Sequence, residues 1–174
     1  MPAYHLAQIN IARMLAPIDD TIMAEFVAQL APVNALADAS PGFVWRLQTE
    51  SGDATNIKVY GDDMIIVNQT VWESAEALRE FVYKSAHYGA LRDRKRWFEK
   101  FDGPYYAMWW VPAGQLPCIE EGKERLDYLR QHGDSAYAFS FKRIFPAPIV
   151  EERSSAHEQR TAALGDDLGA TSPS

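Results

Sequence analysis

Two side chains in one short basic stretch have the types and spacing for chemistry on a small molecule. Residues 85–98 read SAHYGALRDRKRWF, and at helical spacing His87, Leu91, Arg94 and Phe98 fall on one face, while most of the charge points the opposite way. Two helical turns separate His87 from Arg94 by about 10 Å. His87 could act as a general base, and Arg94 could bind a carboxylate or phenolate. Each also has a structural interpretation, a single buried hydrogen bond for His87 and an ion pair for Arg94.

The neighbouring strands supply further polar groups. Asn10 lies in the alternating stretch 4–12 and Asn68 in the apolar stretch 64–72, and the alternation turns both amides towards the predicted helices. Either amide could hydrogen-bond a carbonyl or a developing oxyanion. Aromatic side chains are expected to form the walls, namely Trp45, Trp97 and Trp109. The sequence therefore predicts an aromatic cavity with a few convergent polar groups, the usual composition of a ligand pocket.

The elements that must position these residues follow from switches in hydrophobic period. Strands are expected at 4–12, 43–48, 64–72 and 105–111, with one helix beginning near Asp19 and Asp20 and another near Ser74. Pro32 is expected to break or kink the first helix. The order strand, helix, strand, strand, helix, strand is that of the ferredoxin-like split βαβ fold, an α+β architecture with an antiparallel sheet. A further helix is expected at about 119–132 and a further strand at 136–141.

One face of this sheet would be apolar and uncovered. Its members would be His5, Ala7, Ile9, Ile11, Ile65, Val67 and Val71. Exposed, they would form a larger apolar patch than monomers usually carry. Two copies packing sheet to sheet would bury it, so we expect a homodimer.

Composition limits the classes of partner. The chain has 174 residues, with 24 acidic against 17 basic side chains and a formal net charge of −7, which argues against nucleic acid or an anionic membrane. No apolar run is long enough to span a bilayer, no signal peptide is evident, and the single cysteine forms no internal disulfide. We expect a cytoplasmic protein without a metal site, with one domain over 1–148 and a mobile tail over 149–174.

Several runs of sequence resemble a known family. These are YHLAQINIARML, ALADASPGFVWRLQ, VWESAEALREFVYKSAH and MWWVPAG, within residues 4–142. They resemble a bacterial family of unknown function in the dimeric α+β-barrel superfamily, together with the antibiotic-biosynthesis monooxygenases. The resemblance implies two ferredoxin-like subunits, each with a pocket between sheet and helices.

The superfamily also includes haem-degrading members. The resemblance to them rests on a first-strand asparagine, here Asn10, and a VWxS run, here residues 71–74. Phe81 stands where those members have a catalytic tryptophan, and Leu91 stands where they have the haem-ligating histidine. We expect Phe81 and Leu91 in the pocket wall, with His87 as the axial ligand only if haem binds.

Three functions remain open at this stage. The first is monooxygenase-type oxidation of a planar aromatic or polyene substrate, most simply without a cofactor. The second is a non-redox lyase or cyclase that uses His87 as its base. The third is a binding protein for haem or a hydrophobic metabolite.

Overall fold

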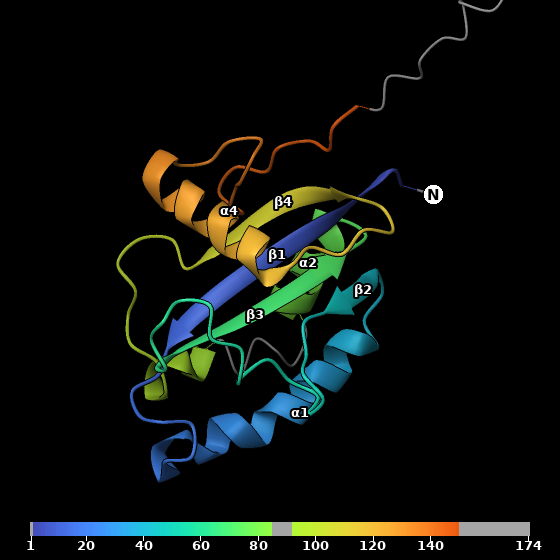
Figure 1. Cartoon of the computed structure of the whole chain (residues 1–174). Helices are drawn as coiled ribbons and strands as arrows, with labels where there is room; N and C mark the ends of the chain where they lie inside the picture. The colour runs from blue at the N-terminus through green and yellow to red at the C-terminus, as the bar shows by residue number, and fades with distance from the viewer. Residues whose placement is uncertain (1, 85–91, 150–174) are drawn as a thin grey trace, which may run out of the picture.

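The chain folds into a four-stranded sheet with helices on both of its faces. A computed structural model describes residues 2–84 and 92–149 (Figure 1). The elements in chain order are β1 (Tyr4–Arg13), the 3-10 turn η1 (Thr21–Met23), α1 (Ala24–Asp38), β2 (Phe43–Arg46), β3 (Ile65–Trp72), α2 (Ala75–Lys84), the 3-10 turn η2 (Arg94–Arg96), β4 (Tyr106–Pro112) and α4 (Ile119–His132). The predicted order of strands and helices is therefore confirmed.

The sheet has the strand order β2-β3-β1-β4, and every neighbouring pair is antiparallel. This is the ferredoxin-like arrangement that the sequence predicts. Residues directly opposite each other in an antiparallel pair point to the same face. Asn10 lies opposite Asn68, and Gln8 lies opposite Thr70. The register thus gathers four polar side chains at the centre of the face that α1 and α2 cover.

The opposite face is not bare, which corrects the expectation behind the homodimer. Helix α4 lies over β1 and β4, on the other side of the sheet from α2 (Figure 1). Ala7, Ile9 and Val71 are fully buried there, against Leu126 and Leu129 of α4. The apolar residues that would have joined two copies sheet to sheet are therefore covered within one chain. A homodimer stays a prediction, but this surface no longer provides its physical reason.

A glycine lets α4 approach the sheet closely. A Cβ atom at Gly122 would lie 2.0 Å from Gln69 Oε1 and 3.0 Å from Ile9 Cδ1. Gln69 is fully buried, and its Nε2 donates to the backbone oxygens of Pro117 (2.9 Å) and Cys118 (3.2 Å) just before the helix begins. The amide of Gln69 thus holds the start of α4 against β3.

Helix α1 is continuous through Pro32, so the predicted break is wrong. Pro32 is exposed, and the carbonyl that loses its helical partner there can bond water instead. Asp20 caps the preceding turn η1 as expected, because its side chain accepts a hydrogen bond from Ile22 N at 2.9 Å. Ala37 is the one fully covered side chain of α1. The helix therefore packs only lightly against the rest of the chain.

Two predicted elements differ in form. The expected strand at 136–141 is reduced to a single bridge, in which Phe139 pairs with Met108. The expected helical stretch 85–98 ends in η2, and Phe98 then forms a bridge with Met14. His87 and Leu91 lie outside the described residues.

Candidate functional site

A cavity of about 260 Å³ lies between the sheet and the helices α1 and α2. Phe26, Leu30 and Val33 of α1 form one wall, and the segment after residue 92 closes another side. Five of the predicted site residues line it, namely Asn10, Asn68, Phe81, Arg94 and Trp97. A ligand in this space would contact aromatic side chains above a polar floor.

The floor consists of side-chain amides joined across β1 and β3. Asn10 Oδ1 accepts two hydrogen bonds, from Gln8 Nε2 at 2.9 Å and from Asn68 Nδ2 at 3.0 Å. Gln8 Oε1 accepts from Thr70 Oγ1 at 3.0 Å, and Thr70 Oγ1 accepts from Trp72 Nε1 at 2.9 Å. Gln8 and Thr70 are buried, whereas Asn10 and Asn68 are half-buried. Asn10 Nδ2 and Asn68 Oδ1 have no partner among the described residues and remain for a ligand.

Arg94 brings a positive charge to the same cavity. Its guanidinium stacks on the ring of Tyr105, with Cζ 4.3 Å from the ring centroid, and both residues line the cavity. Arg94 forms no ion pair with any residue in the described ranges. The structural interpretation, a salt bridge, therefore finds no support in that part of the chain, and the charge is available to an anionic ligand.

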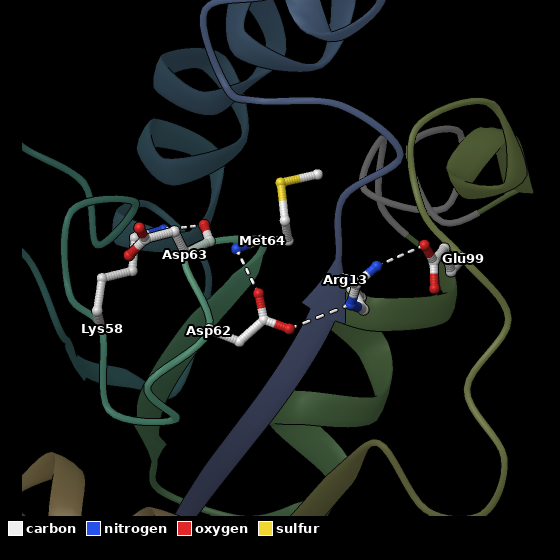
Figure 2. A network of polar contacts seen from close by, with 6 residues as sticks. All are labelled: Arg13, Lys58, Asp62, Asp63, Met64 and Glu99. Atoms are coloured by element: carbon white, nitrogen blue, oxygen red, sulfur yellow. Dashed lines mark hydrogen bonds and ion pairs between the residues drawn. The ribbon is translucent and has the colours of Figure 1, made fainter.

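The segment that carries Arg94 is anchored to the end of β1. Backbone hydrogen bonds join Leu15 N to Trp97 O (2.8 Å) and Glu99 N to Arg13 O (2.8 Å). Figure 2 shows the Arg13 guanidinium between Asp62 (3.2 Å) and Glu99 (2.6 Å). The backbone N–H of Met64 and the Arg13 guanidinium both hydrogen-bond the Asp62 carboxylate and lower its pKa. These contacts hold the cavity wall in place.

The connection between β2 and β3 also lines the cavity, and Arg46 fixes it. Arg46 forms two hydrogen bonds to the Asp38 carboxylate at the end of α1, at 2.8 and 3.2 Å. Its Nη1 donates to the carbonyl of Gly52 at 2.7 Å. Asp53 accepts bonds from the backbone N–H and the hydroxyl of Thr55. The only carboxylate among the described lining residues is thus engaged in a local turn.

Sequence comparison now gives the chain a family. The profile described as Domain of unknown function (DUF3291) matches residues 5–156. The chain belongs to the DUF3291 family. A comparison with curated proteins finds no match for this DUF3291 chain.

Solved structures of two other proteins are similar to the DUF3291 domain. One is the NE2512 protein of unknown function from Nitrosomonas europaea, at 13% identity and a TM-score of 0.45, covering 67% of this chain and 97% of that one. The other is SnoaB, a cofactor-independent oxygenase from Streptomyces nogalater, at 19% identity and a TM-score of 0.43, covering 66% and 97%. The ferredoxin-like fold of the DUF3291 chain follows from its own strand order and connections.

Two predicted wall residues lie elsewhere. Trp109 pairs with Ala7, and Trp45 pairs with Val71, so both tryptophans contact the core beneath α4 instead of the cavity. The strands β2 and β4 are short runs of aromatic and apolar residues, and their alternation alone does not say which face each tryptophan takes. Trp97 is correctly placed in the cavity wall.

The sequence did not point to several polar residues that line the cavity, among them Gln8, Thr70 and Tyr106. Gln8 and Thr70 lie two positions from Asn10 and Asn68 in strands whose parity was known, so the signal was present. Tyr106 lines the cavity next to Asn10, and its hydroxyl oxygen accepts a bond from Phe141 N at 3.1 Å. Burial raises the pKa of Tyr106, so the phenol stays neutral.

Haem needs an axial nitrogen, sulfur or phenolate ligand. Neither imidazole nor sulfur occurs among the described residues that line the cavity, and His87 lies outside the described ranges. The described lining thus offers haem neither imidazole nor sulfur, only the phenols of Tyr83, Tyr105 and Tyr106. Nor do its His, Cys, Asp and Glu side chains form a cluster of three able to hold a metal ion. Among the helices described, none is long and apolar enough to cross a membrane.

Proposed function

We propose that this DUF3291 protein is an enzyme that oxidises a planar aromatic or polyene substrate in the cavity, without a cofactor. The observation that carries the proposal is an amide donor, Asn10 Nδ2, and a guanidinium, Arg94, that lie in one aromatic cavity and have no hydrogen-bond or ion-pair partner, respectively, among the described residues. Together these groups can stabilise an oxyanion delocalised over an aromatic ring.

The reaction uses the substrate itself as reductant. A substrate methylene next to an aromatic carbonyl loses a proton, and Asn10 and Arg94 stabilise the resulting enolate. The enolate carbon gives an electron pair to dioxygen. One oxygen atom becomes the new carbonyl oxygen on that carbon, and the other leaves as water with the two hydrogens of the methylene. The protein supplies binding, orientation and charge stabilisation, and His87 remains the predicted base for the first proton.

Oxygen consumption tests this proposal. Purified protein is incubated in air with aromatic ketones that carry an activated benzylic methylene, and with hydroquinones, while an oxygen electrode records uptake. With ¹⁸O₂ and a ketone substrate, one labelled oxygen is expected in the product, the other in water, and none in peroxide. If no substrate of either type gives protein-dependent oxygen uptake, oxidation in this cavity is wrong.

Arg94 provides the sharpest variant, because a neighbour in the same turn serves as control. Arg94→Gln removes a charge-assisted contact to the substrate anion, so kcat/KM should fall about tenfold or more. Arg96 lies in the same 3-10 turn but pairs with Glu25 at 2.6 Å and does not line the cavity. Arg96→Gln should therefore leave kcat/KM unchanged. Equal losses in both variants would contradict the assignment of Arg94.

A second function is favoured by one observation. The described lining contains one carboxylate, Asp53, which is already engaged by Thr55, and no histidine. A described lining without a free base suits a binding protein that shelters a hydrophobic metabolite. Tight binding without turnover, in air and without oxygen, would favour this role. Turnover without oxygen would instead favour a lyase or cyclase.

A further inference from the structure

Each side-chain amide in the cavity floor can turn either its nitrogen or its oxygen towards the cavity, and two buried residues of the same floor decide which. We propose that Thr70 and Gln8 are positioning residues that hold Asn10 as a hydrogen-bond donor and Asn68 as an acceptor towards the cavity. The site would then select a ligand with a carbonyl or oxyanion at Asn10 and a hydroxyl or N–H at Asn68. This inference rests on the proposed function only in taking the cavity as the place where a ligand binds.

The direction follows from the chemistry of each group along the chain. The indole Nε1 of Trp72 can only donate, so Thr70 Oγ1 accepts from it (2.9 Å). The Thr70 hydroxyl proton is then directed to Gln8 Oε1 (3.0 Å). Gln8 Nε2 consequently faces Asn10 and donates to its Oδ1 (2.9 Å). Asn68 Nδ2 donates to the same oxygen (3.0 Å). Asn10 Nδ2 and Asn68 Oδ1 are the ends that remain.

With the three amides turned over, every bond between the amides could still form, but the Thr70 hydroxyl would lose its acceptor. If all three amides were turned over, Asn10 Nδ2 would donate to Gln8 and Asn68, and Gln8 would donate to Thr70. Thr70 Oγ1 would then accept two bonds, and no described residue would accept its proton. Thr70 is 5% exposed and Gln8 is 8% exposed, so water does not easily replace the missing partner. A buried donor without a partner is costly, so one hydroxyl proton decides between the two directions.

This direction matches the needs of an oxyanion. An amide oxygen facing the cavity from Asn10 would repel a developing negative charge, whereas the Asn10 amide nitrogen stabilises it. Thr70 and Gln8 also line the cavity, but their polar atoms are engaged in the hydrogen-bond chain, so they act on the ligand's polar groups through Asn10 and Asn68. Their effect should therefore appear as a loss of ligand polarity preference and not as a loss of the cavity.

Neutron diffraction on crystals of the full-length protein tests the direction without a ligand. Nuclear density distinguishes nitrogen from oxygen in each amide and places the Thr70 deuterium. We expect Asn10 Nδ2 and Asn68 Oδ1 on the cavity side and the Thr70 deuterium towards Gln8 Oε1. The reverse assignment, or a mixture in the wild-type protein, would overturn the inference even if the cavity binds ligands well.

Two matched planar probes test the consequence. Fluorenone carries a carbonyl acceptor, and fluorene has the same three-ring frame with no polar group. In the wild-type protein, fluorenone should bind about fivefold more tightly than fluorene, the effect of one neutral hydrogen bond, and its carbonyl infrared band should shift to lower frequency. Fluorescence titration and difference infrared spectroscopy measure the two effects. If both probes bind equally and the band does not shift, the inference is wrong while the cavity stands.

Variants of Thr70 connect the probes to the positioning residues. Thr70→Val keeps the shape but removes the hydroxyl, so both amide orientations become possible. The ratio of the affinities for fluorenone and fluorene should then fall towards one. Thr70→Ser keeps the hydroxyl and should restore the preference and the band shift. Gln8→Glu gives a second route, because an ionised carboxylate only accepts and forces Asn10 Nδ2 away from the cavity. An unchanged fluorenone preference in folded Thr70→Val and Gln8→Glu would overturn the role of these residues.

If neither probe binds to the wild-type protein, the proposed ligand class is wrong. The neutron result still decides the direction of the amides in that case. The two failures are thus separate.

Discussion

A methyl group added at Gly122 should separate α4 from the sheet. The new Cβ would lie 2.0 Å from Gln69 Oε1, far closer than atoms approach, and 3.0 Å from Ile9 Cδ1, a tight contact. Gln69 cannot swing away freely, because it is fully buried and its Nε2 bonds the carbonyls of Pro117 and Cys118. Either these hydrogen bonds break or the start of α4 moves outward.

The size of the effect follows from three contributions. Overpacking a buried contact costs about 1–3 kcal/mol. Leaving the Gln69 amide without its acceptors costs a further ~1–3 kcal/mol. Replacing glycine by alanine inside a helix contributes about 1 kcal/mol of stabilisation. Gly122→Ala should therefore lower the free energy of unfolding by about 3 kcal/mol, which corresponds to a decrease of roughly 10 °C in Tm for a domain of this size.

Thermal and urea unfolding of Gly122→Ala measure this change, and a double variant identifies its cause. In a Gln69→Ala background the main clash is gone, so Gly122→Ala should cost far less, with a coupling of about 2 kcal/mol. Gln131→Ala, at an exposed position of the same helix, should leave Tm nearly unchanged. A higher Tm for Gly122→Ala, as helix propensity alone predicts, would refute the close packing of α4 on the sheet.

Two further predictions concern the anchors of the cavity. The pKa of Asp62 is lowered in the folded protein, so its ionised form stabilises the fold above the unfolded pKa near 4, and this stability is lost as pH falls through the lower folded value. In Asp62→Asn, Tm should therefore decrease less steeply than in the wild-type protein as the pH falls from about 5 to about 2. An equal decrease in both proteins would contradict this contribution. Arg46→Ala removes the bonds to Asp38 and Gly52, so hydrogen exchange at residues 47–55 should become about tenfold faster, while α4 amides serve as the unaffected reference.

The sequence predicts the fold well because its strands alternate clearly. Parity in 4–12 and 64–72 places Asn10 and Asn68 correctly. Arg94 and Trp97 line the same cavity as expected, although they lie in and next to the 3-10 turn η2 and not on an α-helical face. The apolar character of the opposite face was also predicted correctly, but helix α4 of the same chain covers it. A helix at 119–132 was predicted, yet its apolar face is narrow, and nothing in its spacing says which surface it covers.

The remaining errors have the same origin. The aromatic character of Trp109 alone predicts a place in the cavity wall, whereas the face that it takes depends on the register between β1 and β4. Register is a property of two strands and cannot be read from one. The proposed positioning role of Thr70 likewise depends on its hydrogen bonds to Gln8 on β1 and to Trp72 on β3. The pairing of the two strands, which one strand's sequence does not reveal, brings these groups together.

The cavity itself has a physical explanation in the amide floor. A sheet face with apolar central residues would draw both helices into close packing, as α4 does on the other side. Here the centre of the helix-facing side carries Gln8, Asn10, Asn68 and Thr70. Apolar side chains over Asn10 Nδ2 and Asn68 Oδ1, which have no partner among the described residues, would leave hydrogen bonds unmade. Helix α1 packs lightly, and space remains above the amides. Polar residues on two central strands thus account for both the chemistry of the site and the space in which a ligand can bind.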